Sequence, residues 1–139
     1  MAAFFTELFR IKPDEAETLL NSDLDREAIP SLWVRSMGDL ELVGLWESLP
    51  NGESEGTLLA EPLSDLDADQ IVTKLPDGFA YCISALHDEE VDEVAEQWSK
   101  MEELKHWDLP DLIQVVRDIQ ILVRDAEANG EIVVQFFEV

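Results

Sequence analysis

Short blocks of apolar residues at helical spacing recur along this chain, and a proline or a glycine ends most of them. Leu42, Leu45, Trp46 and Leu49 follow the i, i+3, i+4, i+7 pattern of one helix face, and Pro50 ends the block. The same spacing returns at residues 64–75, 79–86, 88–107 and 112–126. Two earlier segments, 13–20 and less cleanly 4–9, also fit a helix. The pattern predicts a largely helical chain.

The last block has a different pattern. Residues 132–137 read Ile-Val-Val-Gln-Phe-Phe, a segment rich in β-branched and aromatic side chains and short for another helix. We therefore expect a strand over residues 131–138. Its best partner within the chain is the segment 31–35, and the alternative is pairing across a homodimer through an exposed edge of the C-terminal strand.

The predicted fold class is α+β, mostly α: a compact bundle of about five to six helices with a small sheet that includes the C-terminal strand. A chain of 139 residues suits one ordinary domain. The sequence contains no internal repeat, no low-complexity tract and no convincing linker. We therefore treat residues 1–139 as a single acidic globular domain.

The charge balance excludes several function classes. The chain has 9 Lys and Arg against 32 Asp and Glu, a formal net charge of -23, yet its hydrophobic fraction of 46% is ordinary for a globular domain. A disordered acidic tail lacks apolar residues in that proportion. Direct binding of nucleic acid needs a basic footprint for the phosphates, and an anionic membrane surface repels an acidic domain. We expect neither as a partner.

Cysteine content and hydropathy bear on the compartment. The single cysteine, Cys82, excludes a scaffold held together by disulfides within the chain. The first residues lack the basic and apolar regions of a signal peptide, and no apolar run approaches the length of a membrane span. We therefore expect a cytoplasmic location.

Two sequence patterns begin like metal sites. Asp65, Asp67 and Asp69 have the spacing that opens a calcium loop, but Gln70 stands where the loop needs glycine and Pro76 where it needs glutamate. Glu103 and His106 have the E-x-x-H spacing of di-iron helical bundles, which require two such motifs and further glutamates. We therefore predict neither a metal nor another cofactor.

Nucleophilic chemistry has one candidate. Cys82 paired with His87 or His106 would give a thiolate and an imidazole, but Cys82 shares an apolar stripe with Phe79 and Ile83, which is typical of a buried, inert cysteine. The glycine-rich phosphate loops and common hydrolase motifs are missing from the sequence. We predict no catalytic residue and expect a protein that is not an enzyme. An enzyme or metal protein that uses Glu103, His106 or Cys82 stands as the third alternative.

The densest acidic segment runs from Asp88 to Glu103. It holds eight acids, and Lys100 is its only cation. On a helix these acids present carboxylates along one face, and like charges four residues apart cost stability. One interpretation is a surface that only keeps the protein in solution; the other is recognition of a basic partner.

Aromatic residues could anchor such an interface. Of the four tryptophans, Trp46 and Trp98 lie on apolar stripes and are expected in the core, whereas Trp33 and Trp107 flank breaks in the pattern. Our leading hypothesis is a non-enzymatic interaction domain that binds and blocks a basic protein, as immunity proteins and nucleic-acid mimics do. Its predicted contacts are Asp88, Glu89, Asp92, Glu93, Glu96, Trp107 and Trp33. The alternative is a structural or oligomerising module whose acidic surface serves only solubility.

Overall fold

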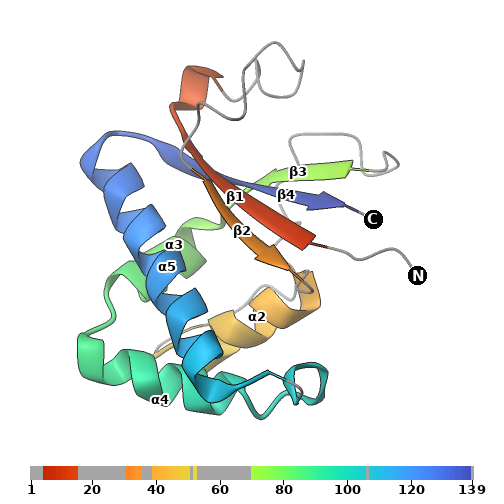
Figure 1. The fold of residues 1–139 in the computed structure, drawn as a ribbon. Helices are drawn as coiled ribbons and strands as arrows, with labels where there is room; N and C mark the ends of the chain where they lie inside the picture. Colours follow the sequence, from red (N-terminus) through yellow and green to blue (C-terminus); the bar gives the residue numbers. More distant parts are fainter. Residues whose placement is uncertain are drawn as a thin grey trace.

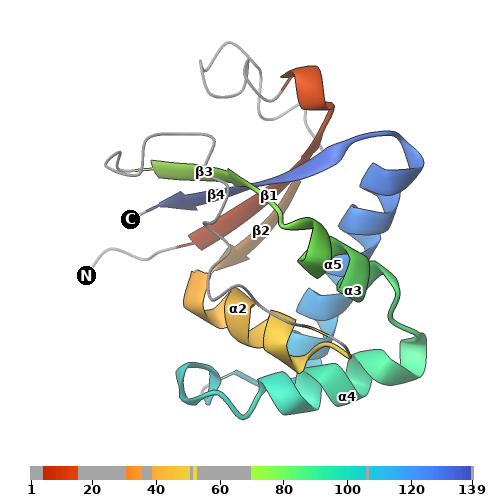
Figure 2. The ribbon, with the colours of Figure 1, turned by 180° about the vertical axis from the view of Figure 1, so that it is seen from behind.

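A four-stranded antiparallel sheet packs against a layer of helices (Figure 1). The computed structural model describes residues 5–15, 31–35, 39–50, 52, 70–105 and 107–138. The strands are β1 (Phe5–Ile11), β2 (Ser31–Arg35), β3 (Gln70–Lys74) and β4 (Ile132–Glu138). The helices are α2 (Asp39–Ser48), α3 (Asp77–Ser84), α4 (Asp88–Trp98) and α5 (Leu109–Ala128), with short 3-10 turns η1 (Pro13–Glu15) and η3 (Glu102–Leu104). In both views the four described α-helices lie on one side of the sheet (Figure 2).

The C-terminal strand lies inside the sheet. The strand order is β2-β1-β4-β3, and Gln135 of β4 stands opposite Leu8 of β1 on one side and Thr73 of β3 on the other. The predicted strands at 131–138 and 31–35 are both confirmed, but β2 pairs with β1, so the expected pairing of these two segments is wrong. The homodimer through an exposed edge of β4 is also wrong, because β1 and β3 occupy both edges of that strand.

Two segments that we expected to be helical are strands. Residues 4–9 fall largely in β1, where Leu8 packs toward the helices and Phe9 is buried on the opposite face. A strand that is apolar on both faces loses the alternation that distinguishes it from a helix. The end of the block 64–75 is β3, in which Ile71, Val72 and Thr73 are β-branched in succession. Residues 64–69 of that block, among them Asp65, Asp67 and Asp69, lie outside the described residues, as do residues 16–20 of the helix expected at 13–20.

The other helices form close to where they were expected. The helix predicted at 88–107 ends at Trp98, and the chain continues through η3, because Met101 adopts an extended backbone conformation. Helix α5 begins with Pro110 in its first turn. It ends before Gly130, whose φ of 68° is the left-handed conformation that glycine adopts at little cost.

The core lies between the sheet and the helices. Leu8, Val133 and Ile119 are buried there from three different elements, and Trp46 and Trp98 are buried as predicted. The rings of Trp46 and Phe79 meet edge to face with their centroids 6.0 Å apart. These contacts join α2, α3, α4 and α5 into one layer. Among the described helices, none combines the length and the apolar character that crossing a membrane requires.

Candidate acidic docking site

Helix α4 has a strongly polarised sequence that favours its position on the surface. Val91, Val94, Ala95 and Trp98 form its buried stripe. Acidic residues fill the first turn, where the partial positive charge of a helix N-terminus stabilises them. The backbone N–H of His87 donates a 3.0 Å hydrogen bond to Glu90 Oε1, which closes the start of the helix.

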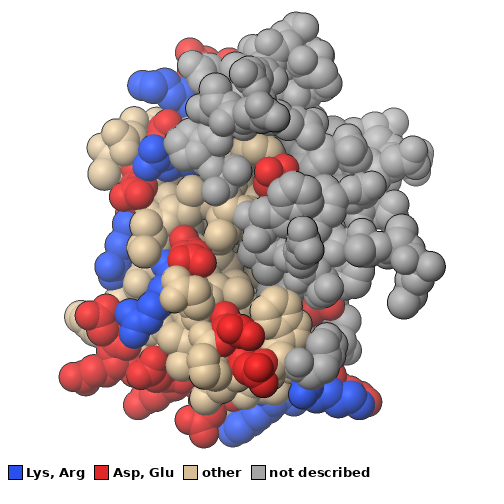
Figure 3. Space-filling model, viewed as in Figure 1, with Lys and Arg blue, Asp and Glu red and all other residues tan. Residues whose placement is uncertain are grey.

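The five predicted acidic contacts share the opposite face of α4. All five carboxylates are exposed. At 100° per residue they cover an arc of about 140° around the helix axis. Their order around that arc is Asp88, Asp92, Glu96, Glu89 and Glu93. Acidic side chains gather at the lower left of Figure 3, where Figure 1 places α4.

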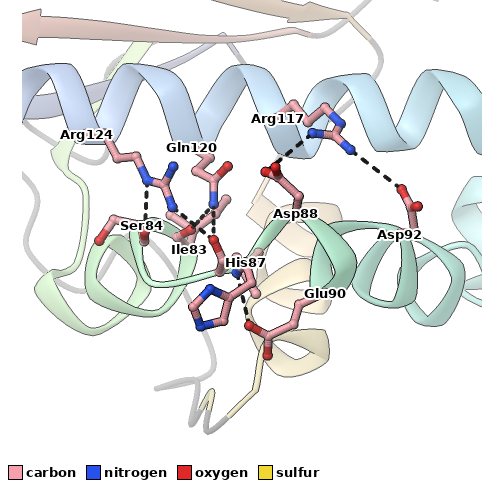
Figure 4. A network of polar contacts seen from close by, with 10 residues as sticks. Ile83, Ser84, His87, Asp88, Glu90, Asp92, Arg117, Gln120 and Arg124 are labelled. Carbon is pink, nitrogen blue, oxygen red and sulfur yellow. Dashed lines mark hydrogen bonds and ion pairs between the residues drawn. The ribbon is translucent and has the colours of Figure 1, made fainter.

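Arg117 of α5 lies beside one border of this acidic face. Its Nη1 is 3.8 Å from Asp88 Oδ1 and its Nη2 is 3.9 Å from Asp92 Oδ1 (Figure 4). The arginine thus offsets repulsion between two carboxylates that are four residues apart. Within the described part of the chain, the carboxylates of Glu89 and Glu93 have no cationic partner of this kind.

Helix α5 also fixes the point at which α4 begins. Gln120 Nε2 donates hydrogen bonds to the carbonyl oxygens of Ile83 and Leu86, and Arg124 donates to the carbonyl oxygens of Ser84 and Leu86 (Figure 4). Carbonyl groups at the end of a helix lack partners within it. The two α5 side chains supply these partners and hold the α3–α4 connection. Sequence reasoning missed both residues, although a glutamine inside the apolar stripe of α5 was a usable signal.

The two predicted aromatic anchors do not lie together at the centre of the acidic face. Trp107 is half-buried against the core and follows η3, so it lies beyond the C-terminal end of α4. Asp88 stands at the other end of this helix of about 16 Å. Trp33 belongs to the edge strand β2, and its side chain lies outside the described part.

Of the three side chains of the enzyme alternative, that of Cys82 lies within the described part of the chain. Cys82 is half-buried on α3, and burial raises the pKa of its thiol, which disfavours the reactive thiolate. The side chain of Glu103 and all of His106 lie outside the described residues. Among the residues that are described, no three His, Cys, Asp or Glu side chains are grouped so as to hold a metal ion.

Comparisons with known proteins found a similarity in structure. No protein-family model matches the chain. No curated protein matches it in sequence either. Its structure is similar to the crystal structure of YfbM from Escherichia coli, a protein of unknown function, with a TM-score of 0.52 and 14% sequence identity. The similarity covers 97% of this chain and 99% of that one, so the α+β, mostly helical architecture is shared over nearly the whole length.

Proposed function

We propose that this chain is a non-enzymatic, cytoplasmic interaction domain whose α4 face binds and blocks a basic protein. The observation that carries the proposal is the exposure of Asp88, Glu89, Asp92, Glu93 and Glu96 on one face of a single helix. A helix anchored by its neighbours presents these charges in a fixed arrangement. Fixed complementary charges accelerate encounter with a partner and select its orientation.

The charge of α4 supports a cationic partner. Its eleven residues include six acids and neither Lys nor Arg. Arg117 is placed against Asp88 and Asp92 at one border, which leaves Glu89, Glu93 and Glu96 as the proposed direct contacts. A partner that brings Lys or Arg to these three carboxylates relieves repulsion that the free protein retains.

The aromatic residues have a secondary role in this proposal. Trp107 lies at the end of the acidic face and offers a half-buried ring at the rim of the interface. Trp33 is retained as a proposed second anchor on β2. We expect the carboxylates to control the association rate and its salt dependence, and the aromatic contacts to control the dissociation rate.

The test compares two variants of equal net charge. In the first, Glu89→Gln, Glu93→Gln and Glu96→Gln remove three carboxylates from α4. In the matched control, Asp14→Asn, Glu102→Gln and Asp111→Asn remove three exposed carboxylates elsewhere. The partner offered is the basic product of a neighbouring gene, and association is measured by surface plasmon resonance at low and at high salt.

We expect the α4 variant to associate about tenfold more slowly than the unmodified protein, with a weaker salt dependence, and the control to change little. Equal slowing of both variants would reduce the effect to net charge alone. If the basic neighbour does not bind, the proposal fails for it. Sedimentation at several concentrations tests the oligomerising alternative, and metal analysis of the purified protein tests the metal-protein alternative.

A further inference from the structure

A small hollow lies where β3 enters α3, beside the end of α5 and the start of β4. Its volume is about 220 Å³. The walls are mainly apolar, formed by Leu75, Ala80, Val123, Ala126, Ile132 and Val133. Tyr81 stands at this hollow with 73% of its surface exposed, whereas most large apolar side chains of the described chain are buried. An exposed tyrosine beside an apolar hollow is typical of an interaction surface.

The charges around this hollow favour a cationic ligand. Lys74 Nζ is 3.3 Å from Asp77 Oδ1, and Arg10 Nε is 3.0 Å from Glu131 Oε1, so each of these two cations is already paired with an acid. Glu127 adds a carboxylate that forms no ion pair with the described residues. Helix α5 also ends here, without a basic residue in its last turn, and its terminal carbonyl groups carry partial negative charge.

A second hollow is also lined by Tyr81. It has a volume of about 170 Å³, and its lining includes Pro50, Ala85 and the carboxylate-bearing Glu90. Tyr81 therefore lines two mainly apolar hollows, each with an acid in its lining. Such an arrangement suits a segment that offers both basic and aliphatic groups to this surface.

We propose that the larger hollow binds a single arginine or lysine side chain of a basic protein. The aliphatic stem of such a side chain packs on the apolar wall, while its charged head stays at the mouth. There Glu127 provides an ionic contact and the face of Tyr81 a cation–π contact. The inference shares with the proposed function the premise of a basic partner, and it adds a contact outside α4. Glu127 is ten residues beyond Arg117, about 15 Å along α5.

The experiment uses small probes, so that it does not depend on the partner. The full-length protein, labelled with ¹⁵N, is titrated with n-butylguanidinium, with n-butanol and with butyrate, and its amide signals are followed by NMR. We expect n-butylguanidinium to cause saturable shifts at the amides of Ala80, Tyr81, Ala126 and Glu127. Weaker shifts are expected with n-butanol and none at this hollow with butyrate, because the charged head group contributes to binding.

Variants then assign the contacts. Glu127→Gln and Tyr81→Ala should each weaken binding of n-butylguanidinium by about two- to fivefold, the range expected for exposed charge contacts. Asp111→Asn is the control, since it removes a carboxylate from the first turn of the same helix, about 24 Å away, and should leave binding unchanged.

Three results would overturn this inference: equal binding of n-butanol and n-butylguanidinium, an equal loss in Asp111→Asn, or shifts confined to α4. Saturable binding in the hollow supports this inference whatever the α4 variants show. If those variants leave the association of the basic partner unaffected, that result counts against the proposed function alone.

Discussion

The side-chain amide of Gln120 donates a 2.9 Å hydrogen bond to the backbone carbonyl oxygen of Leu86, 34 residues away in the chain. A second bond of 3.1 Å runs from the same nitrogen to the carbonyl oxygen of Ile83. Gln120 is 4% exposed, and its amide gives buried donors to carbonyl groups at the end of α3 and in the connection that follows it. The acidic helix α4 begins two residues after Leu86. Its position therefore depends on a contact made by α5.

Replacing Gln120 with leucine should destabilise the protein. The substitution nearly preserves side-chain volume but removes two buried hydrogen bonds. The carbonyl oxygen of Ile83 keeps the backbone N–H of Leu86, and that of Leu86 keeps Arg124, so we expect the loss of two net hydrogen bonds, about 1–3 kcal/mol in all. Urea unfolding followed by tryptophan fluorescence measures this loss in the free energy of unfolding. The control is Gln114→Leu, on the exposed side of the same helix, which should change stability by less than about 0.5 kcal/mol. Equal stability of both variants would show that the amide of Gln120 does not support the α3–α4 connection.

Helices with one buried face were predictable from the sequence. A strand buried on both faces and the order of the strands in the sheet were not. The apolar stripe of α5 and the acidic face of α4 follow directly from helical periodicity, because each helix has one side toward the core. In β1, Leu8 and Phe9 are consecutive and both buried, so their segment has no alternation to read. The place of β4 between β1 and β3 depends on pairings between the two ends of the chain, which local patterns do not specify.

The same limit applies to the candidate site. Exposure of Glu89, Glu93 and Glu96 was predictable because they lie opposite the apolar stripe of their own helix. The pairing of Arg117 with Asp88 was not, since it requires the relative orientation of α4 and α5. The hollow beside Tyr81 was also missed, because its wall combines residues from four elements.

Replacing Arg117 with methionine should have a small effect on stability that depends on salt. The change keeps an apolar stem but removes the cation beside Asp88 and Asp92. The side chain of Arg117 is partly exposed, with 38% of its surface accessible. We expect a loss of less than about 1 kcal/mol at low ionic strength, because exposed ion pairs contribute little. Thermal unfolding at low and at high salt measures it, and the difference should shrink as screening increases. A loss that is large and independent of salt would mean that packing, and not charge, is the role of this arginine.

The left-handed backbone at Gly130 predicts which substitutions at this position cost more stability. A Cβ at this position meets no neighbouring atom, so any loss of stability comes from the backbone conformation at a φ of 68°. Gly130→Ala should cost about 1–2 kcal/mol, while Gly130→Asn should cost less, because asparagine tolerates this conformation better. Urea unfolding of the two variants beside the unmodified protein tests the order. If alanine proves at least as stable as asparagine, then the turn after α5 is not held in this conformation.

The buried indole of Trp98 ties α4 to α2, and its loss should loosen the acidic face. Its Nε1 donates a 2.8 Å hydrogen bond to the carbonyl oxygen of Glu41 in the first turn of α2. Trp98→Phe removes this bond and leaves space in the core, so we expect a loss of about 1–3 kcal/mol in the free energy of unfolding. Urea unfolding provides the measurement. Trp107→Phe is the control, since that ring is only half-buried, and it should lose less. A larger loss of stability in Trp107→Phe than in Trp98→Phe would contradict the role of Trp98 in joining α4 to α2.

The thiol of Cys82 should react slowly near neutral pH. Burial raises the pKa of this thiol above its ordinary value of 9.0, so the folded protein contains less thiolate at any given pH than an exposed cysteine would. The rate of alkylation by iodoacetamide is followed by mass spectrometry from pH 7 to pH 10. For the folded protein this rate should increase at a higher pH than for the urea-unfolded chain. The same shift makes the free energy of unfolding depend on pH. Because the folded state holds the thiol proton more tightly, stability is retained below the ordinary pKa and decreases as pH rises beyond it. If the folded chain reacts faster than the unfolded chain at pH 8, Cys82 is an activated thiol, and the enzyme alternative regains support.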